Sequence, residues 1–150
     1  MKKLRFFTVI TLLSFLFAGL QAQDTKEIYM EGHDNMKFTV ENITVKPGEN
    51  VAVTLKTVSN LPKAQMAHNF VLLKKDTDVE AFVLECIKHR DNNYIAPGET
   101  DHIIAQTGML GDGEKDTVTF PAPGQPGEYI YVCTFPGHYQ AGMKGTLTVK

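Results

Sequence analysis

The sequence contains few cysteines and no block of basic residues, and both features narrow the range of functions. Only two of the 150 residues are cysteines, Cys86 and Cys133, so at most one disulfide can form within the chain. Fifteen basic residues stand against 17 acidic ones, which gives a formal net charge of −2. A mildly acidic chain without a basic patch is a poor partner for nucleic acid. We therefore expect no nucleic-acid binding.

Long apolar runs are also missing, except at the start of the chain. Residues 1–5 are basic, residues 6–20 are almost entirely apolar, and small and polar residues follow at 18–22. This order is typical of a secretory signal peptide cleaved after Ala22. A membrane anchor is the alternative, but the run is short for crossing a bilayer. We expect a soluble periplasmic protein without stable membrane insertion.

Cleavage after Ala22 leaves 128 residues, which is enough for one domain with its own core. The mature chain has a formal net charge of −5, because three basic residues leave with the signal. The sequence shows no internal repeat, linker or low-complexity tract. It predicts a signal peptide at 1–22 and a single domain at 23–150.

Most of the mature chain consists of short apolar or alternating segments separated by glycine- and proline-containing turns. This pattern is typical of an antiparallel β-sandwich with seven or eight strands. The sequence therefore predicts an all-β fold. The expected strands lie at 36–40, 43–45, 51–55, 68–73, 102–106, 117–120, 128–133 and 145–149.

One segment has helical periodicity instead, and we expect a helix at about 77–90. Apolar residues recur there at positions 79, 82, 83, 86 and 87, which lie on one face of a helix. Thr77 and Glu80 have the spacing of a capping box. The helix places Cys86 on its buried side as a free thiol. A Cys86–Cys133 disulfide is the alternative.

The motif that indicates chemistry lies near the C-terminus, between two predicted strands. Cys133 ends one strand, His138 follows five residues later, and Met143 follows after five more. One loop can therefore present a thiolate, an imidazole and a thioether to a single point. His68, which opens another predicted strand, can supply a fourth donor.

One thiolate and two imidazoles with a weak axial thioether form the donor set of electron-transfer copper sites. Sulfur donors favour Cu(I), and imidazole suits both oxidation states. Taken singly, Cys133, His138 and Met143 have simpler explanations as a buried thiol, a surface histidine and a core methionine. Their joint spacing at a strand junction favours a metal site.

Several stretches resemble the azurin family of blue-copper proteins. They are residues 60–63, 66–69, 111–120, 133–138 and 142–149. The loop from Cys133 to Met143 is one residue longer than in typical azurins and is more similar to that of auracyanin. Both belong to the cupredoxins, so the resemblance implies an eight-stranded Greek-key sandwich that binds one copper.

The resemblance also assigns roles to individual residues. It implies His68, Cys133 and His138 as equatorial copper ligands, Met143 as the axial ligand, and the carbonyl of Ala67 as a second, weak axial contact. Azurins usually have glycine at the position of Ala67. The resemblance further implies that Asn69 holds the ligand loop by hydrogen bonds to Thr134. The family's N-terminal disulfide is missing, because no cysteine precedes Cys86.

The function implied by the resemblance is electron transport rather than catalysis. The expected protein is a soluble, monomeric type 1 copper carrier that exchanges single electrons with transient redox partners, such as cytochromes or respiratory-chain components. In this family the ring of the residue matching His138 reaches the surface through an apolar patch. The residues that can form this patch here are Leu61, Pro62, Met66, Phe135, Pro136 and Ala141.

Three other functions remain as alternatives. A copper enzyme of the same superfamily needs a second copper centre, usually built from additional histidines, and this chain has no His-x-His pair. Copper storage or delivery and a metal-free binding module are the other two. The remaining histidines, His33, His89 and His102, have no spaced partner, and we expect them to be surface or sheet-edge residues.

Overall fold

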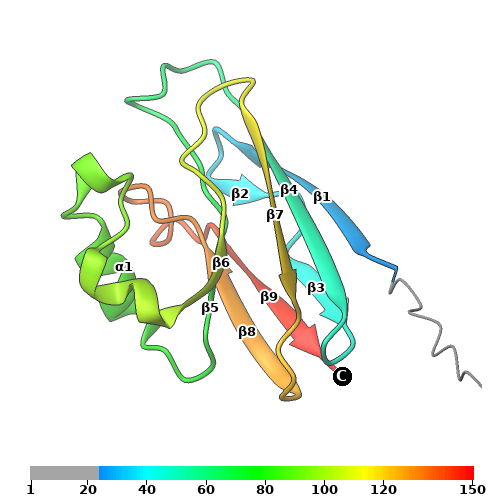
Figure 1. Cartoon of the computed structure of the whole chain (residues 1–150). Coiled ribbons are helices and arrows are strands. Elements are labelled where there is room, and N and C mark those ends of the chain that lie inside the picture. The colour runs from blue at the N-terminus through cyan, green and yellow to red at the C-terminus, as the bar shows by residue number, and fades with distance from the viewer. Residues whose placement is uncertain (1–23) are drawn as a thin grey trace, which may run out of the picture.

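A computed structural model describes residues 24–150, which form two β-sheets packed face to face with a helical segment at one side (Figure 1). One sheet has the strand order β2-β1-β4-β7, and the other has the order β3-β9-β8-β5-β6. The strands are β1 (Lys26–His33), β2 (Lys37–Phe38), β3 (Asn42–Val45), β4 (Asn50–Val58), β5 (Val71–Leu73), β6 (Ile103–Gln106), β7 (Lys115–Pro121), β8 (Gly127–Val132) and β9 (Lys144–Val149). The predicted all-β sandwich is confirmed.

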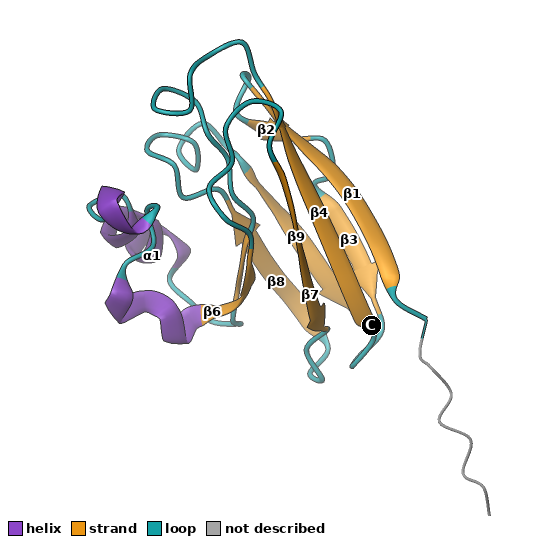
Figure 2. Cartoon of the chain, turned by 45° about the horizontal axis from the view of Figure 1, so that its top comes forward, coloured by secondary structure: helices purple, strands orange, loops and turns teal. Residues whose placement is uncertain are grey.

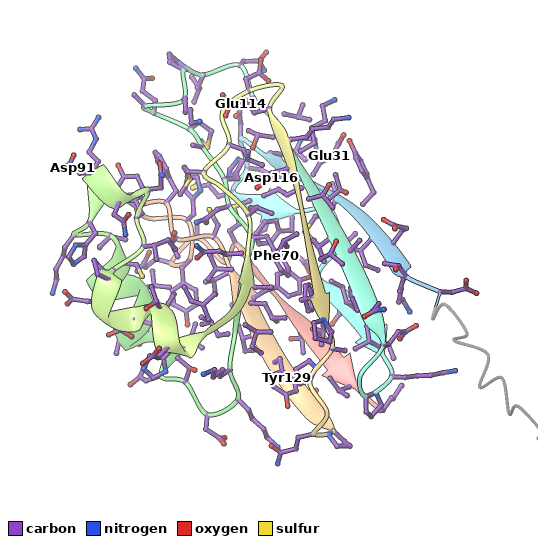
Figure 3. All side chains as sticks on the ribbon, in the orientation of Figure 1. Glu31, Phe70, Asp91, Glu114, Asp116 and Tyr129 are labelled. Carbon is purple, nitrogen blue, oxygen red and sulfur yellow. The ribbon has the colours of Figure 1, made fainter. Side chains whose placement is uncertain are left out.

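The core lies between the two sheets and follows the alternation of the strands. In β4 the side chains of Val51, Val53 and Leu55 are completely buried, because every second residue of a strand faces the same side. Phe70 lies in the middle of this core and Tyr129 lies near one end of it (Figure 3). Apolar burial between two such faces supplies the main stabilisation of the sandwich.

The strand pairing differs from the purely antiparallel prediction. The β1 strand runs parallel to β4, and β3 runs parallel to β9. The chain crosses between the sheets, because β2 and β4 belong to the first sheet and the intervening β3 belongs to the second. This crossing allows the parallel pairs. Alternation in a sequence defines the buried face of a strand but not its partner.

The predicted helix exists, but it is shorter than expected. The helix α1 spans Val79–Cys86, and Asp78 caps its N-terminus by accepting a hydrogen bond from the amide of Ala81 at 3.1 Å. Asp78 therefore takes the capping role that the sequence assigned to Thr77. Two 3-10 helices follow, η1 (Arg90–Asn92) and η2 (Pro97–His102). The helical segment lies beside the sandwich, on the side of β6 (Figure 2).

The inner face of α1 forms a second, smaller core, called here the satellite core. Its fully buried members are Val71, Leu73, Phe82, Val83, Cys86, Ile95, Ala96 and Val132. Cys86 and Cys133 are both free, buried thiols. The predicted burial of Cys86 is confirmed, and the alternative disulfide is not formed.

The predicted signal peptide, residues 1–22, lies outside the described part of the chain, and its boundary stays a prediction. Within residues 24–150 the structure contains no helix with the length and hydropathy needed to cross a membrane.

Candidate metal centre

The three strongest predicted donors meet in the interior at one end of the sandwich. The Nδ1 atoms of His68 and His138 lie 3.2 Å apart, and the Sγ atom of Cys133 lies 3.4 Å from the Nδ1 of His138 and 4.0 Å from that of His68. The donor atoms of all three residues lie within 4.8 Å of one another. The structure thus brings together residues that are up to 70 positions apart in sequence.

Each donor is placed by a different part of the sandwich. His68 lies in an isolated β-bridge with Leu110, formed by two backbone hydrogen bonds of 2.8 and 2.9 Å. Cys133 directly follows the last residue of β8, and His138 lies in the loop between β8 and β9. The positive φ of Gly137, +83°, lets this loop turn immediately before His138.

The separations among the three donors fit a single metal ion. A point equidistant from the three atoms lies about 2.1 Å from each, as follows from their separations. Metal–imidazole bonds measure about 2.0–2.1 Å and metal–thiolate bonds about 2.3 Å, as in zinc sites. Two imidazoles and one thiolate in a trigonal arrangement are the donor set that selects copper in electron-transfer proteins.

Met143 is completely buried beside the same cluster. Gly32 of β1 marks the contact, because a Cβ atom added at Gly32 would lie 2.8 Å from the His68 ring and 3.0 Å from the Cε of Met143. Two backbone hydrogen bonds fix the methionine: its amide donates to the carbonyl of His138 at 2.9 Å, and its carbonyl accepts from the amide of Cys133 at 3.2 Å. The thioether side chain therefore lies next to the His68 ring.

Ala67 also lies close to the sulfur of Cys133. It is completely buried, and its carbonyl oxygen lies 3.9 Å from the Sγ of Cys133. The methyl group that distinguishes it from the usual glycine is thus accommodated in the core.

A pair of reciprocal hydrogen bonds joins the two chain segments that carry the donors. The Nδ2 of Asn69 donates to the hydroxyl of Thr134 at 2.8 Å, and the amide of Thr134 donates to the Oδ1 of Asn69 at 2.8 Å. Both residues are buried. The expected link between Asn69 and Thr134 is confirmed, and it holds His68 and Cys133 in fixed relation.

Burial controls the protonation of the three donors. It lowers the pKa of both His68 and His138 to about 4, and for His68 the neighbouring His138 adds to this effect. Burial raises the pKa of the Cys133 thiol to about 12, against the opposing effect of the backbone amides of Asn69 and Phe135. At neutral pH both imidazoles are neutral and can donate a lone pair, whereas the thiol must exchange its proton for a metal ion.

The Nε2 atom of His68 is buried and makes no hydrogen bond within 3.5 Å to residues 24–150. Burial lowers the pKa of His68, and the nearby backbone of His33 raises it slightly against this larger effect. The contacts of His68 with the other two donors are made by its Nδ1 atom. The Nδ1 atom is therefore the metal-facing nitrogen of His68.

The surface around His138 differs from the expectation. Its ring is only 2% exposed, because the rings of Phe135 and His68 pack against it with centroid distances of 4.7 and 4.9 Å. Of the six patch residues, Leu61, Pro62, Pro136 and Ala141 are exposed, whereas Met66 and Phe135 are buried. Four of the six expected patch residues are therefore exposed, but the His138 ring itself is buried.

The remaining histidines lie outside the donor cluster. Each lies beside a glutamate: His33 is 3.1 Å from Glu31, His89 is 3.4 Å from Glu85, and His102 is 3.7 Å from Glu99. All three are partly or fully exposed, as expected. Sequence reasoning missed Gly32, whose lack of a side chain makes room for two of the predicted ligands. No local pattern in the sequence marked this role, because the strand that carries Gly32 was not predicted.

Comparisons with known proteins agree with this geometry. Residues 25–150 match the family model described as copper binding proteins, plastocyanin/azurin family. The chain is 40% identical to azurin from Pseudomonas aeruginosa over 98% of this chain and 99% of that protein. It is 39% identical to auracyanin-B from Chloroflexus aurantiacus over 77% of this chain and 48% of that protein.

A solved structure is similar as well. Dithionite-reduced auracyanin from Roseiflexus castenholzii superimposes with a TM-score of 0.73 at 36% identity, over 83% of this chain and 97% of that one. The match to the family model extends over nearly the whole described chain. The chain belongs to the copper-binding plastocyanin/azurin family.

Proposed function

We propose that this chain is an exported carrier of single electrons that holds one type 1 copper ion. His68, Cys133 and His138 serve as equatorial ligands, Met143 as the axial ligand, and the carbonyl of Ala67 as a weak second axial contact. The observation that carries the proposal is the buried triangle of two Nδ1 atoms and one Sγ atom. When bound, copper supplies the one-electron couple between Cu(I) and Cu(II).

The protein's part is to keep the donors from moving when the electron arrives. The β-bridge of His68, the two hydrogen bonds between Asn69 and Thr134, and the backbone bonds of Met143 restrain the ligand segments on different sides. A close-packed interior resists rearrangement. Restrained donors lower the reorganisation needed for each transfer, which suits a carrier.

Burial also favours a carrier over an enzyme. His68, Cys133 and His138 are each at most 2% exposed, so a substrate has no direct access to the donor cluster. Catalytic metal sites keep an open position for substrate or water. A copper protein with a closed site acts on its partner by passing electrons through its surface.

The surface through which electrons pass is the apolar area over His138. Leu61, Pro62, Pro136 and Ala141 are exposed, and the buried ring of Phe135 packs against the His138 ring. Exposed apolar area of this kind marks docking sites, and small interfaces suit short-lived redox complexes. The partners are transient redox proteins, of the class of cytochromes or respiratory-chain components, and the carrier acts as a periplasmic monomer after loss of residues 1–22.

The test is to add Cu(II) to purified residues 23–150 and record the visible spectrum. We expect a strong thiolate-to-copper absorption band with one copper per chain, followed by reversible one-electron voltammetry. Cys133→Ser must abolish the band, whereas the matched variant Cys86→Ser must retain it. A colourless wild-type protein contradicts the proposal, and a coloured protein without a reversible wave favours storage.

A further inference from the structure

Lys37 connects the N-terminal part of the chain with the loop that carries His138 and Met143. Its Nζ atom lies 3.0 Å from the carbonyl oxygen of Ala141 and 3.2 Å from that of Gly142. The side chain is half-buried. We propose that Lys37 is a positioning residue, which fixes the Met143 end of the ligand loop and raises the reduction potential of the bound copper. This inference rests on the proposed role of Met143 as a ligand.

The loop needs such a partner at this point. Successive backbone hydrogen bonds from Ala141 to Gly137, from Gly142 to Tyr139 and from Met143 to His138 give it the form of a helical turn. A helical turn leaves its last carbonyls without intrahelical partners, and a cation at that end is favourable. The carbonyl of Gly142 also accepts a hydrogen bond from the amide of Lys144 at 3.0 Å, so the Ala141 carbonyl depends most on Lys37. An ammonium group has three donors, so Lys37 can bind both carbonyls at once.

Lys37 belongs to β2, which forms a hairpin with β1. This β1–β2 hairpin also contacts the ligand side chains. The β2 strand pairs with β1 through Gly32 opposite Phe38 and His33 opposite Lys37. A Cβ atom added at Gly32 would lie 2.8 Å from the His68 ring and 3.0 Å from the Cε of Met143, so Gly32 packs closely against both side chains. The hairpin therefore restrains Met143 twice, once at the loop backbone that precedes it and once at its side chain. Lys37 supplies the first of these restraints.

The charge of Lys37 has a separate consequence for the redox equilibrium. Reduction lowers the charge of the copper site by one unit, so a nearby cation favours the reduced state. Because Lys37 is half-buried and fixed by two hydrogen bonds, its charge is screened less than that of a mobile surface lysine. Removing this charge should therefore favour the oxidised protein.

The variant Lys37→Met removes the charge and the donors but keeps most of the apolar stem. At a fixed ambient potential we expect the ratio of reduced to oxidised protein to fall by about fivefold. In the copper-free protein we expect amide hydrogen exchange at Met143 to accelerate about tenfold, because the hydrogen bond from Met143 to His138 opens more often. Lys37→Arg keeps the cation and its donors and should restore most of both values.

Lys26→Met is the matched control. The Nζ of Lys26 also donates to a backbone carbonyl, that of Thr44, at 2.7 Å, but Lys26 lies at the opposite end of β1. The Lys26→Met variant loses the same formal charge. It should leave the redox ratio and the amide exchange at Met143 at their wild-type values. Equal shifts of the redox ratio in the two variants, or wild-type exchange at Met143 in Lys37→Met, overturn the proposal. If the wild-type chain binds no copper, the proposed function fails, and the exchange rates of the copper-free protein still decide whether Lys37 positions the loop.

Discussion

The two cysteines lie in two interiors of the same molecule, and both side chains are completely buried. Cys133 lies in the main core, where its sulfur faces the Nδ1 atoms of His68 and His138. Cys86 lies in the satellite core, and the amide of Ala96 donates to its sulfur at 3.4 Å. Burial raises the pKa of both thiols. What distinguishes the two thiols is therefore the set of donors around each of them, and not their burial.

Replacing Cys133 should give the largest effect and sharpen this comparison most. Free copper at a thousandfold excess over its dissociation constant stabilises a folded protein by about 4 kcal/mol. We expect this gain for the wild type and for Cys86→Ser, and none for Cys133→Ser. Urea unfolding with and without copper measures it. Equal copper stabilisation of both cysteine variants would place the site elsewhere.

Gly32→Ala should disturb the packing of the main core around the donors and leave the satellite core intact. The added methyl group would lie 2.8 Å from the His68 ring and 3.0 Å from the Cε of Met143, so both side chains must shift. We expect about tenfold weaker copper binding and a loss of about 1–3 kcal/mol in unfolding free energy, typical of overpacking.

Gly98→Ala is the control for Gly32→Ala. A Cβ atom there meets nothing within 4 Å, so its unfolding free energy should stay within about 0.5 kcal/mol of the wild type. Copper titration measures the copper affinity of the two variants, and urea unfolding measures their unfolding free energy. Wild-type copper affinity in Gly32→Ala contradicts the described packing of the site.

The copper-free protein should lose stability as the pH falls from 6.5 towards 4. The unfolded chain protonates its histidines below their ordinary pKa of 6.5, whereas burial holds the pKa of His68 and His138 at about 4 in the folded chain. Protonation therefore favours the unfolded chain, and each ring lowers the unfolding free energy by about 2–3 kcal/mol over this range.

Urea unfolding between pH 6.5 and pH 5 isolates this effect, because carboxyl groups titrate mostly at lower pH. His138→Gln should reduce the dependence by about half, because it removes one of the two buried rings. A flat profile in the wild type contradicts the buried, neutral state of the two rings.

Cys86→Ala should give the smallest effect. It removes one buried sulfur from the satellite core, where we expect a loss of about 1 kcal/mol in unfolding free energy. Its copper spectrum and reduction potential should match the wild type, since Cys86 belongs to the satellite core, whereas Cys133 and Met143 belong to the main core. A change in the spectrum would show that the two cores are coupled.

Local patterns predicted most of the fold. Eight of the strands coincide with segments whose alternation or apolar runs indicated them, and the buried face of α1 follows from its periodicity. The β1 strand was missed because only Ile28 and Met30 mark its inner face before Gly32. The parallel pairing of β1 with β4 was not predictable in the same way, because it joins segments that no local turn connects.

The residues of the site also differ in whether local sequence patterns could predict them. Cys133, His138 and Met143 lie on one loop, so their spacing already indicated a common point. Gly32 and Lys37 act on that loop from the other end of the chain, and only tertiary packing reveals them. The burial of His138 was also missed, because it depends on how Phe135 packs against the imidazole.

X-ray absorption at the copper edge of the loaded protein tests the central claim most directly, because it reports the atoms bound to the metal. The geometry of His68, Cys133 and His138 predicts a first shell of two imidazole nitrogens and one thiolate sulfur, all within about 2.3 Å. The sulfur must disappear in Cys133→Ser and persist in Cys86→Ser. A first shell of nitrogen and oxygen alone in the wild-type protein would contradict the account.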